Sequence, residues 1–225
     1  MNPEGKQTSN GSQEKPWPEP GLAGRSVLAI GTILFGLGVY KLVQMGTTSQ
    51  GYHFESAWDH RLPFVPEMIV IYIGCFPFLF VSATQMEVSR FWRALLTMLL
   101  VCAGSWVCFF LFPSSVTRPD PGTIESEWLR WIFVRLHEID DPHNSFPSLH
   151  VSTTWICAIA LLGRKSSGFW IFCAILISLS TMLVEQHTIA DVLGGMGMAA
   201  LGWTASVPIM NRIQKYRSRA DHLPD

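Results

Sequence analysis

Six apolar stretches alternate with shorter polar segments along the chain, and this pattern is typical of a membrane protein. The stretches cover residues 26–43, 64–83, 95–112, 148–162, 169–184 and 189–210. A helix needs about 20 residues to cross a hydrocarbon core of about 30 Å. The fourth and fifth stretches are shorter than that, which a helix tolerates where its end lines a polar cavity inside the protein. The pattern therefore predicts an all-α integral membrane bundle of six transmembrane helices.

The two ends of the chain are polar. Residues 1–22 consist largely of Pro, Gly, Ser, Gln and Glu, and such a composition buries too little apolar area to offset the entropy of the chain. We predict a disordered cytoplasmic tail at 1–22, a six-helix membrane domain at 23–211 and a basic cytoplasmic tail at 212–225. No small-residue cleavage site follows the first apolar stretch, so we expect it to be a retained helix and not a signal peptide.

The segment between the third and fourth predicted spans, residues 113–147, contains a further helical pattern. Several of its residues recur at intervals of three and four positions, the spacing of one helix face. These residues are Ile124, Trp128, Trp131, Ile132, Arg135, Leu136 and Ile139. The spacing predicts an amphipathic extracytoplasmic helix. A tryptophan-rich helix of this kind suits the membrane interface, and a lid packed on the spans explains the spacing equally well.

Composition supports the membrane assignment and narrows the possible partners. The chain is 48% hydrophobic and only 15% charged, and its mean hydropathy is +0.26, whereas soluble domains carry about 25% charged residues. The net charge of −1 provides no basic surface for nucleic acid. All five cysteines fall in apolar stretches, where cysteine usually acts as a small buried hydrophobic residue.

Lysine and arginine are distributed unequally between the two predicted sides of the membrane. Of the 16 Lys and Arg residues, eleven fall on the side that holds both termini, and five fall on the other. Cytoplasmic segments carry an excess of these residues. We therefore expect a multi-pass protein of the cell (plasma) membrane with both termini in the cytoplasm.

Three segments on the predicted extracytoplasmic side carry polar residues where a span begins or ends. They are residues 117–119, 144–150 and 187–191. Ionisable residues close to a membrane span are costly and are usually functional. Since all three segments fall on one side of the membrane, we expect them to form one extracytoplasmic active site.

The residue types in these segments fit nucleophilic and acid–base chemistry. His187 and Asp191 are four positions apart, so they share one helix face. A carboxylate there accepts from one imidazole nitrogen and leaves the other for nucleophilic attack. His150 belongs to another helix start and is a candidate to protonate a leaving oxygen. Arg118 offers bidentate geometry for phosphate, and Ser148 adds a hydroxyl at the free N–H groups of a helix start.

The three segments resemble the signatures of the type 2 phosphatidic acid phosphatase superfamily, whose membrane members have six helices. Arg118-Pro119 resembles the end of the first signature, Lys-x6-Arg-Pro. Residues 147–150, Pro-Ser-Leu-His, resemble the second signature, Pro-Ser-x-His. Ser180 through His187 to Asp191 resemble the third, Ser-Arg-x5-His-x3-Asp. The resemblance covers roughly residues 64–197.

The resemblance implies a role for each candidate residue. It implies that His187 is the nucleophile that forms a phosphohistidine and that Asp191 orients it. It further implies that His150 acts as acid and base, and that Arg118 and Ser148 hold the phosphate. Neither a metal ion nor another cofactor is expected.

Two positions depart from these signatures. Leu111 stands where the lysine is expected and Thr181 where the arginine is expected, so two cations are missing, and Glu185 adds a negative charge nearby. Each charged hydrogen bond contributes roughly 1.5–3 kcal/mol, and we expect weaker binding of a phosphate dianion. The leucine of Pro-Ser-Leu-His and the segment 58–66 are more similar to the inositol phosphorylceramide synthase-like branch, whose members move a phosphorylated headgroup between lipids.

The sequence therefore predicts a membrane-embedded lipid phosphate phosphatase or phosphotransferase, with a lipid phosphate or phospholipid as substrate and no nucleic-acid partner. Three alternatives remain open. The first is a headgroup transferase of the inositol phosphorylceramide synthase type, and the second is a non-catalytic protein that binds lipid phosphate. The third is an iron site made of two histidines and a carboxylate.

Overall fold

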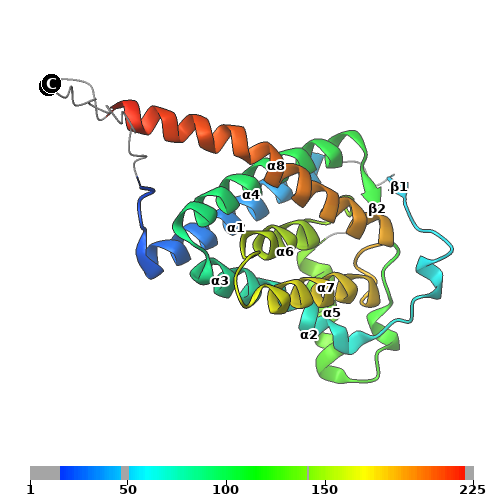
Figure 1. Ribbon diagram of the computed structural model, residues 1–225. Helices are drawn as coiled ribbons and strands as arrows, with labels where there is room; N and C mark the ends of the chain where they lie inside the picture. Colours follow the sequence, from blue (N-terminus) through cyan, green and yellow to red (C-terminus); the bar gives the residue numbers. More distant parts are fainter. Residues whose placement is uncertain (1–15, 47–50, 141, 221–225) are drawn as a thin grey trace, which may run out of the picture.

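The computed structural model describes residues 16–46, 51–140 and 142–220, and this part of the chain is mainly helical (Figure 1). The helices are α1 (Gly21–Gly46), α2 (Ile69–Ile73), α3 (Cys75–Gln85), α4 (Val88–Leu111), α5 (Glu127–Ile139), α6 (Leu149–Ala160), α7 (Ser167–Leu183) and α8 (Ile189–Ala220). The short 3-10 helices are η1 (Asp59–Arg61), η2 (Pro66–Met68) and η3 (Pro121–Thr123). Strands β1 (Tyr52–His53) and β2 (Ser114–Ser115) pair in parallel. The prediction of an all-α fold is confirmed.

Four helical segments in the described part of the chain are long and apolar enough to cross a membrane. They are Gly21–Gly46, Pro66–Gln85, Val88–Leu111 and Ile189–Arg219. The two remaining helices of the predicted spans, α6 and α7, have 12 and 17 residues. Large apolar side chains face outward along the long helices, as expected where lipid surrounds a protein. The protein is therefore a membrane protein, and the count of six spans stays a prediction.

The second long segment is interrupted between α2 and α3. Pro77 has no N–H group, so the carbonyl of Ile73 loses its partner four residues later, and the helix breaks at Gly74. The break allows the two parts to pack differently, with α2 against α7 and α3 against α1 and α6. Tyr72 at the end of α2 is thereby buried beside α6.

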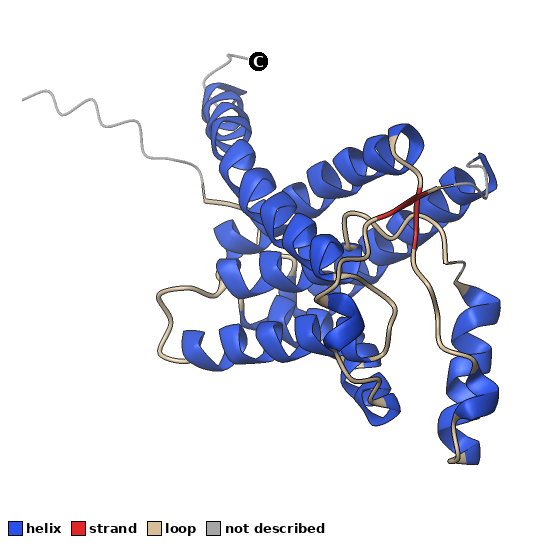
Figure 2. Cartoon of the chain, turned by 90° about the vertical axis from the view of Figure 1, so that its right-hand side faces the viewer, coloured by secondary structure: helices blue, strands red, loops and turns tan. Residues whose placement is uncertain are grey.

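The centre of the bundle is α6, which packs against α3, α4, α7 and α8 (Figure 1). Its apolar residues Ile156, Cys157 and Leu161 are completely buried, because helices surround α6 on several sides. Helix α8 crosses α4 and then extends beyond the bundle (Figure 2). Since α6 is short and central, its first turn lies inside the protein and not at the lipid surface.

The two ends of the described chain lie together. Arg217 of α8 donates a hydrogen bond of 2.9 Å to the carbonyl of Pro16, and its guanidinium lies 4.7 Å from the centre of the Trp17 ring. Residues 1–15 of the predicted N-terminal tail and 221–225 of the predicted C-terminal tail lie outside the described residues. The basic residues from 212 onward continue α8 as far as Ala220.

Candidate functional site

Helices α6 and α8 begin side by side, and this brings the candidate residues together. The N–H of Ser148 donates to the carbonyl of Asp191 at 3.1 Å, and the hydroxyl of Ser152 donates to the carbonyl of Gly195 at 3.1 Å. A Cβ on Gly195 would lie 2.6 Å from the carbonyl oxygen of Ser148. Glycine at this position therefore permits an approach of the two helices that any other residue would block.

The first turn of α8 is held by reciprocal hydrogen bonds. The Asp191 carboxylate accepts from the N–H of Thr188 at 2.8 Å, and the N–H of Asp191 donates to the Thr188 hydroxyl at 3.2 Å. This is a capping box. The next N–H, that of Ile189, donates to Asp59 Oδ1 at 2.7 Å. Asp191 is completely buried, so its carboxylate is fixed in position before any substrate binds.

Two histidines face each other beside this turn. His187 Nδ1 lies 3.4 Å from Asp191 Oδ2, which is longer than an ordinary hydrogen bond. The centre of the His150 ring is 6.2 Å from that of His187. His150 Nε2 is buried and has no hydrogen-bond partner among the described residues, and the ring stacks on Tyr72 at 4.4 Å. The arrangement leaves nitrogen atoms of both rings available to a ligand.

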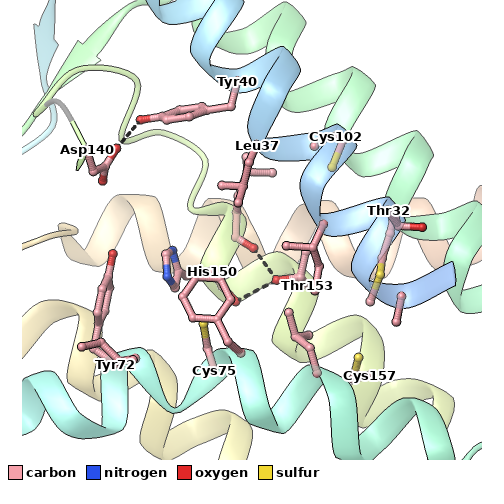
Figure 3. Close-up of a pocket in the computed structure, with 18 of the residues that line it drawn as sticks. Thr32, Leu37, Tyr40, Tyr72, Cys75, Cys102, Asp140, His150, Thr153 and Cys157 are labelled. Atoms are coloured by element: carbon pink, nitrogen blue, oxygen red, sulfur yellow. Dashed lines mark hydrogen bonds between the residues drawn. The ribbon is translucent and has the colours of Figure 1, made fainter. Parts of the chain in front are cut away.

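Arg118 is connected to the site by its contacts with Asp140. Its guanidinium donates to the backbone carbonyl of Asp140 at 2.7 Å and to the Asp140 carboxylate at 3.1 Å. The same carboxylate accepts at 2.9 Å from the hydroxyl of Tyr40, which belongs to α1 (Figure 3). Asp140 lines the cavity that His150 and His187 also line. The structure thus places Arg118 next to the cavity wall, with the Asp140 carboxylate between Arg118 and Tyr40.

Ser148 is the N-cap residue of α6. Its hydroxyl accepts from the N–H of Val151 at 3.3 Å, and the residue is completely buried. The preceding segment is held by Ser114 of β2, whose hydroxyl accepts from the N–H of Phe146 at 2.8 Å and from the Ser145 hydroxyl at 3.1 Å. The peptide bond between Phe146 and Pro147 is cis. Ser148 therefore contributes to the helix start that carries His150.

The two positions with missing cations have different surroundings. Leu111 is the last residue of α4 and is 59% exposed, whereas Thr181 is completely buried and donates its hydroxyl to the carbonyl of Ser178. Neither lines the cavity, but the cations Lys41 and Arg135 do. Burial raises the pKa of the Glu185 carboxyl, and the negative charge of Glu55 raises it further.

The cavity has a volume of about 520 Å³ and combines one polar end with long apolar walls. At the polar end lie Tyr40, Tyr72, Asp140 and His150, and from there the cavity continues between α1, α3, α4 and α6 (Figure 3). Five residues of α5 line it, so this helix forms part of the wall; they are Trp131, Ile132, Arg135, Leu136 and Ile139. Trp128 on the same helix is 55% exposed. The placement of α5 at a membrane interface stays a prediction.

A metal centre takes three or more ligands from side chains such as His, Cys, Asp and Glu. In the described part of the chain, no three His, Cys, Asp or Glu side chains are grouped so that they could hold a metal ion. The rings of His150 and His187 are 6.2 Å apart between centres, and the Asp191 carboxylate accepts from the N–H of Thr188. The geometry offers no support for the alternative of an iron site.

Several residues of the site were not among the candidates from the sequence. Tyr40 and Tyr72 lie in apolar helices, and Asp140 directly follows α5. Asp59 lies in η1, within the segment 58–66. These four residues stand apart from one another in the sequence, and their spacing does not say which helices meet.

The fold and the motif positions agree with a comparison of the chain with protein families. The family model of the PAP2 superfamily matches residues 90–215, which is more than half of the chain. The chain belongs to the PAP2 superfamily. No curated protein and no solved structure matches the chain.

The match to the PAP2 superfamily covers α4 to α8 and includes all five candidate residues. Members of this superfamily are generally phosphatases or phosphotransferases, so membership suggests a function of the lipid phosphatase type for this membrane protein. The match begins after α1, α2 and α3. Those helices supply Tyr40 and Tyr72, so part of the site is formed by residues outside the matched region.

Proposed function

We propose that this PAP2 protein transfers a phosphoryl group from a lipid phosphate or phospholipid through a phosphohistidine intermediate on His187. One observation carries the proposal: His187, paired with the buried Asp191, faces His150 at the polar end of a long apolar cavity. A nucleophile, an acid and a place for a lipid chain are thereby next to one another. The PAP2 membership supports the same class of reaction.

In the first half of the reaction, His187 attacks phosphorus through Nε2, because Nδ1 faces Asp191. The new nitrogen–phosphorus bond forms as the bond between phosphorus and the leaving oxygen breaks. Protonated His150 gives its proton to that oxygen, which leaves as an alcohol. Asp191 stabilises the positive charge that develops on His187, since its carboxylate is already fixed by Thr188.

In the second half, neutral His150 accepts a proton from the incoming hydroxyl group. The oxygen of water or of a lipid alcohol attacks phosphorus, and the nitrogen–phosphorus bond to His187 breaks. With a lipid phosphate as donor, His187 carries a phosphoryl group, and water yields free phosphate. With a phospholipid as donor, His187 carries the phosphorylated headgroup, and a lipid alcohol yields a new headgroup lipid. The proton removed from the hydroxyl group restores the protonated His150 that began the cycle.

Arg118 and Ser148 are proposed to hold the phosphate oxygens. For Arg118 this requires that phosphate share or replace the contact with Asp140, which now occupies two of the guanidinium nitrogens. A phosphate is a bidentate partner of the same kind as a carboxylate. The N–H groups in the first turn of α6, next to Ser148, offer a second region of positive potential.

A headgroup transferase is the second candidate, and the charge of the site favours it. Leu111 and Thr181 provide no cation, and the Asp140 carboxylate lies on the cavity wall. A phosphodiester carries one negative charge where a phosphomonoester carries up to two, so it demands fewer cations. The inositol phosphorylceramide synthase-like pattern at 58–66 and 147–150 points in the same direction.

We further propose that the site lies on the extracytoplasmic side of the plasma membrane, with both termini in the cytoplasm.

The experiment is a product assay with purified protein in liposomes. A panel of lipid phosphates and phospholipids, with and without a lipid alcohol, is analysed by mass spectrometry. Free phosphate identifies a phosphatase, and a new headgroup lipid identifies a transferase. Rapid quenching in alkali, which preserves phosphohistidine, tests for label on His187.

His187→Ala is expected to abolish every product, whereas His60→Ala is the matched control because His60 is an exposed histidine in η1. Normal turnover in His187→Ala would refute the mechanism. Saturable binding of lipid phosphate by the unaltered protein without turnover would instead identify the non-catalytic alternative.

A further inference from the structure

The apolar part of the cavity has no role in the reaction steps described above, although it makes up most of the wall. It follows α1 from Tyr40 to Ala29 and α4 from Phe109 to Phe91. Two threonines line it, but their hydroxyls donate to their own helices: Thr32 to the carbonyl of Leu28 and Thr153 to that of Leu149. Both threonine hydroxyls therefore have hydrogen-bond partners, and this part of the wall does not need a polar ligand.

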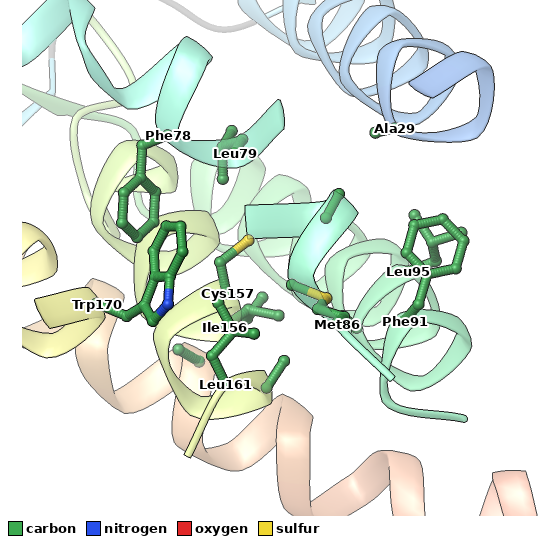
Figure 4. Close-up of a cluster of buried hydrophobic side chains, with 14 of the residues drawn as sticks. Ala29, Phe78, Leu79, Met86, Phe91, Leu95, Ile156, Cys157, Leu161 and Trp170 are labelled. Atoms are coloured by element: carbon green, nitrogen blue, oxygen red, sulfur yellow. The ribbon is translucent and has the colours of Figure 1, made fainter. Parts of the chain in front are cut away.

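The far end of the cavity is lined by Ala29, Ala83, Met86, Phe91 and Leu95, and Figure 4 shows Met86, Phe91 and Leu95 close to one another. Arg25 does not line the cavity but lies behind this end. It is 8% exposed, donates hydrogen bonds to the carbonyls of Ala83 and Met86, and lies 5.4 Å from the centre of the Phe91 ring. These contacts hold the end wall in place.

The length and volume of the cavity suit one extended hydrocarbon chain. Ala29 and Tyr40 are 11 residues apart on α1, and Phe91 and Phe109 are 18 residues apart on α4. At about 1.5 Å per residue these separations are about 16 and 27 Å. The volume of about 520 Å³ lies within the range of about 300–1,000 Å³ that is usual for pockets that bury a small ligand.

One glycine, Gly36, lies at a narrow part of the cavity. Gly36 of α1 lines the cavity, and a Cβ placed on it would lie 3.6 Å from Sγ of Cys102 on α4. The cavity is therefore narrow where α1 passes α4, and the absence of a side chain at Gly36 keeps it open there. Gly36 is one turn of helix, about 6 Å, from Tyr40 at the polar end.

We propose that this cavity binds one long chain of the lipid substrate, and that Gly36 and the end wall at Ala29, Met86 and Phe91 limit the length of the chain. The headgroup lies at His150 and His187, and the chain extends past Gly36 toward Phe91. The inference rests on the proposed function for the chemistry of the headgroup only. The chain-binding walls on α1 and α3 lie outside the residues matched by the family, so family membership does not imply this selectivity.

The test compares three variants of the full-length protein in liposomes. Gly36→Leu fills the cavity about 6 Å from Tyr40, and Ala29→Leu fills it about 16 Å from Tyr40. Gly31→Leu is the matched control, because Gly31 is exposed and nothing lies within 4 Å of its Cβ position. The substrates are a series of single-chain alkyl phosphates with short, medium and long chains. Ala29→Leu also guards against misfolding of Gly36→Leu, because it tests the same wall at another depth.

The preference for long over short chains is expected to fall at least about tenfold in Gly36→Leu, since each buried methylene contributes about fourfold to affinity. Ala29→Leu is expected to lose activity toward the longest chains alone, and Gly31→Leu to behave like the unaltered protein. Identical chain-length profiles in Gly36→Leu and Gly31→Leu would overturn the proposal.

A second measurement does not depend on turnover. A long-chain alcohol with a photoreactive diazirine near its far end is cross-linked to the protein, and the labelled residues are identified by mass spectrometry. Label near Met98 and Phe91, lost in Gly36→Leu and kept in Gly31→Leu, supports the proposal even if no substrate is turned over, in which case the proposed function fails alone. Label confined to the outer surface of the helices contradicts the chain-binding cavity.

Discussion

The close contact between α6 and α8 leads to a sharp prediction for Gly195→Ala. The added Cβ would lie 2.6 Å from the Ser148 carbonyl oxygen, 3.0 Å from Val151 Cβ and 3.3 Å from the Ser152 nitrogen. Two of these three atoms belong to the backbone of α6, so no side chain can rotate away. An ordinary contact is at least about 3.4 Å, and the two helices must separate by about 0.8 Å.

This separation acts directly on the site. The hydrogen bond from Ser148 N–H to the Asp191 carbonyl, now 3.1 Å, would lengthen beyond hydrogen-bond distance, and His150 would move away from His187. Overpacking costs about 1–3 kcal/mol of stability, and a displacement of about 1 Å at reacting groups costs about 100-fold in rate. We expect Gly195→Ala to fold with a lower unfolding temperature and to lose about 100-fold in kcat.

Gly197→Ala is the matched control, because nothing lies within 4 Å of its Cβ position on the same helix. Alanine is favoured over glycine in a helix by about 1 kcal/mol, so the control should be as stable as the unaltered protein or more so. The assays are thermal unfolding in detergent and turnover of the substrate found with the lipid panel. If Gly195→Ala and Gly197→Ala have equal stability and activity, the reasoning about the helix contact is wrong.

Three further predictions concern single contacts. Arg118→Lys keeps the charge but loses the bidentate geometry, so we expect KM for the lipid phosphate to rise about tenfold in steady-state kinetics, and an unchanged KM would contradict phosphate binding by Arg118. Tyr40→Phe removes the hydrogen bond to Asp140 and is expected to cost about 0.5–1.5 kcal/mol of stability, whereas Tyr52→Phe, at an exposed tyrosine, should leave thermal unfolding unchanged. Burial alone would raise the pKa of Asp59, but hydrogen bonds from Ser56 and from the Ile189 N–H outweigh it and hold the pKa below its usual value. The Asp59 carboxylate therefore stabilises the fold at pH values above about 4, and this contribution is lost as the pH falls through the lowered pKa. Asp59→Ala should reduce the unfolding temperature at neutral pH. If the unfolding temperature of Asp59→Ala is reduced by the same amount in acid, the assignment is wrong.

Much of the site was predictable because the chemistry of a helix start is local. The spacing of four positions predicts one helix face for His187 and Asp191, but α8 begins at Ile189, so only Asp191 lies in the helix. His187 lies just before it, with Nδ1 3.4 Å from Asp191 Oδ2. The glycines of α8 differ in their surroundings. A Cβ on Gly194 or Gly195 would collide with Phe146 or Ser148, whereas nothing lies within 4 Å of a Cβ on Gly197. A glycine-rich pattern does not say which side of a helix faces a neighbour.

The sequence by itself determined the helical class, the apolar stretches and the positions of the motif residues, because hydrophobic periodicity and spacing along a helix depend on near neighbours in the chain. It also predicted that the polar segments share one face, which agrees with the contact between the starts of α6 and α8. Only the tertiary structure decided that Asp140 pairs with Arg118 and Tyr40, that Asp59 binds the first turn of α8, and that Gly36 faces Cys102. Tyr40 and Asp140 are 100 residues apart in the sequence. Contacts of this kind depend on how helices turn toward one another, and the packing of the whole bundle sets those orientations.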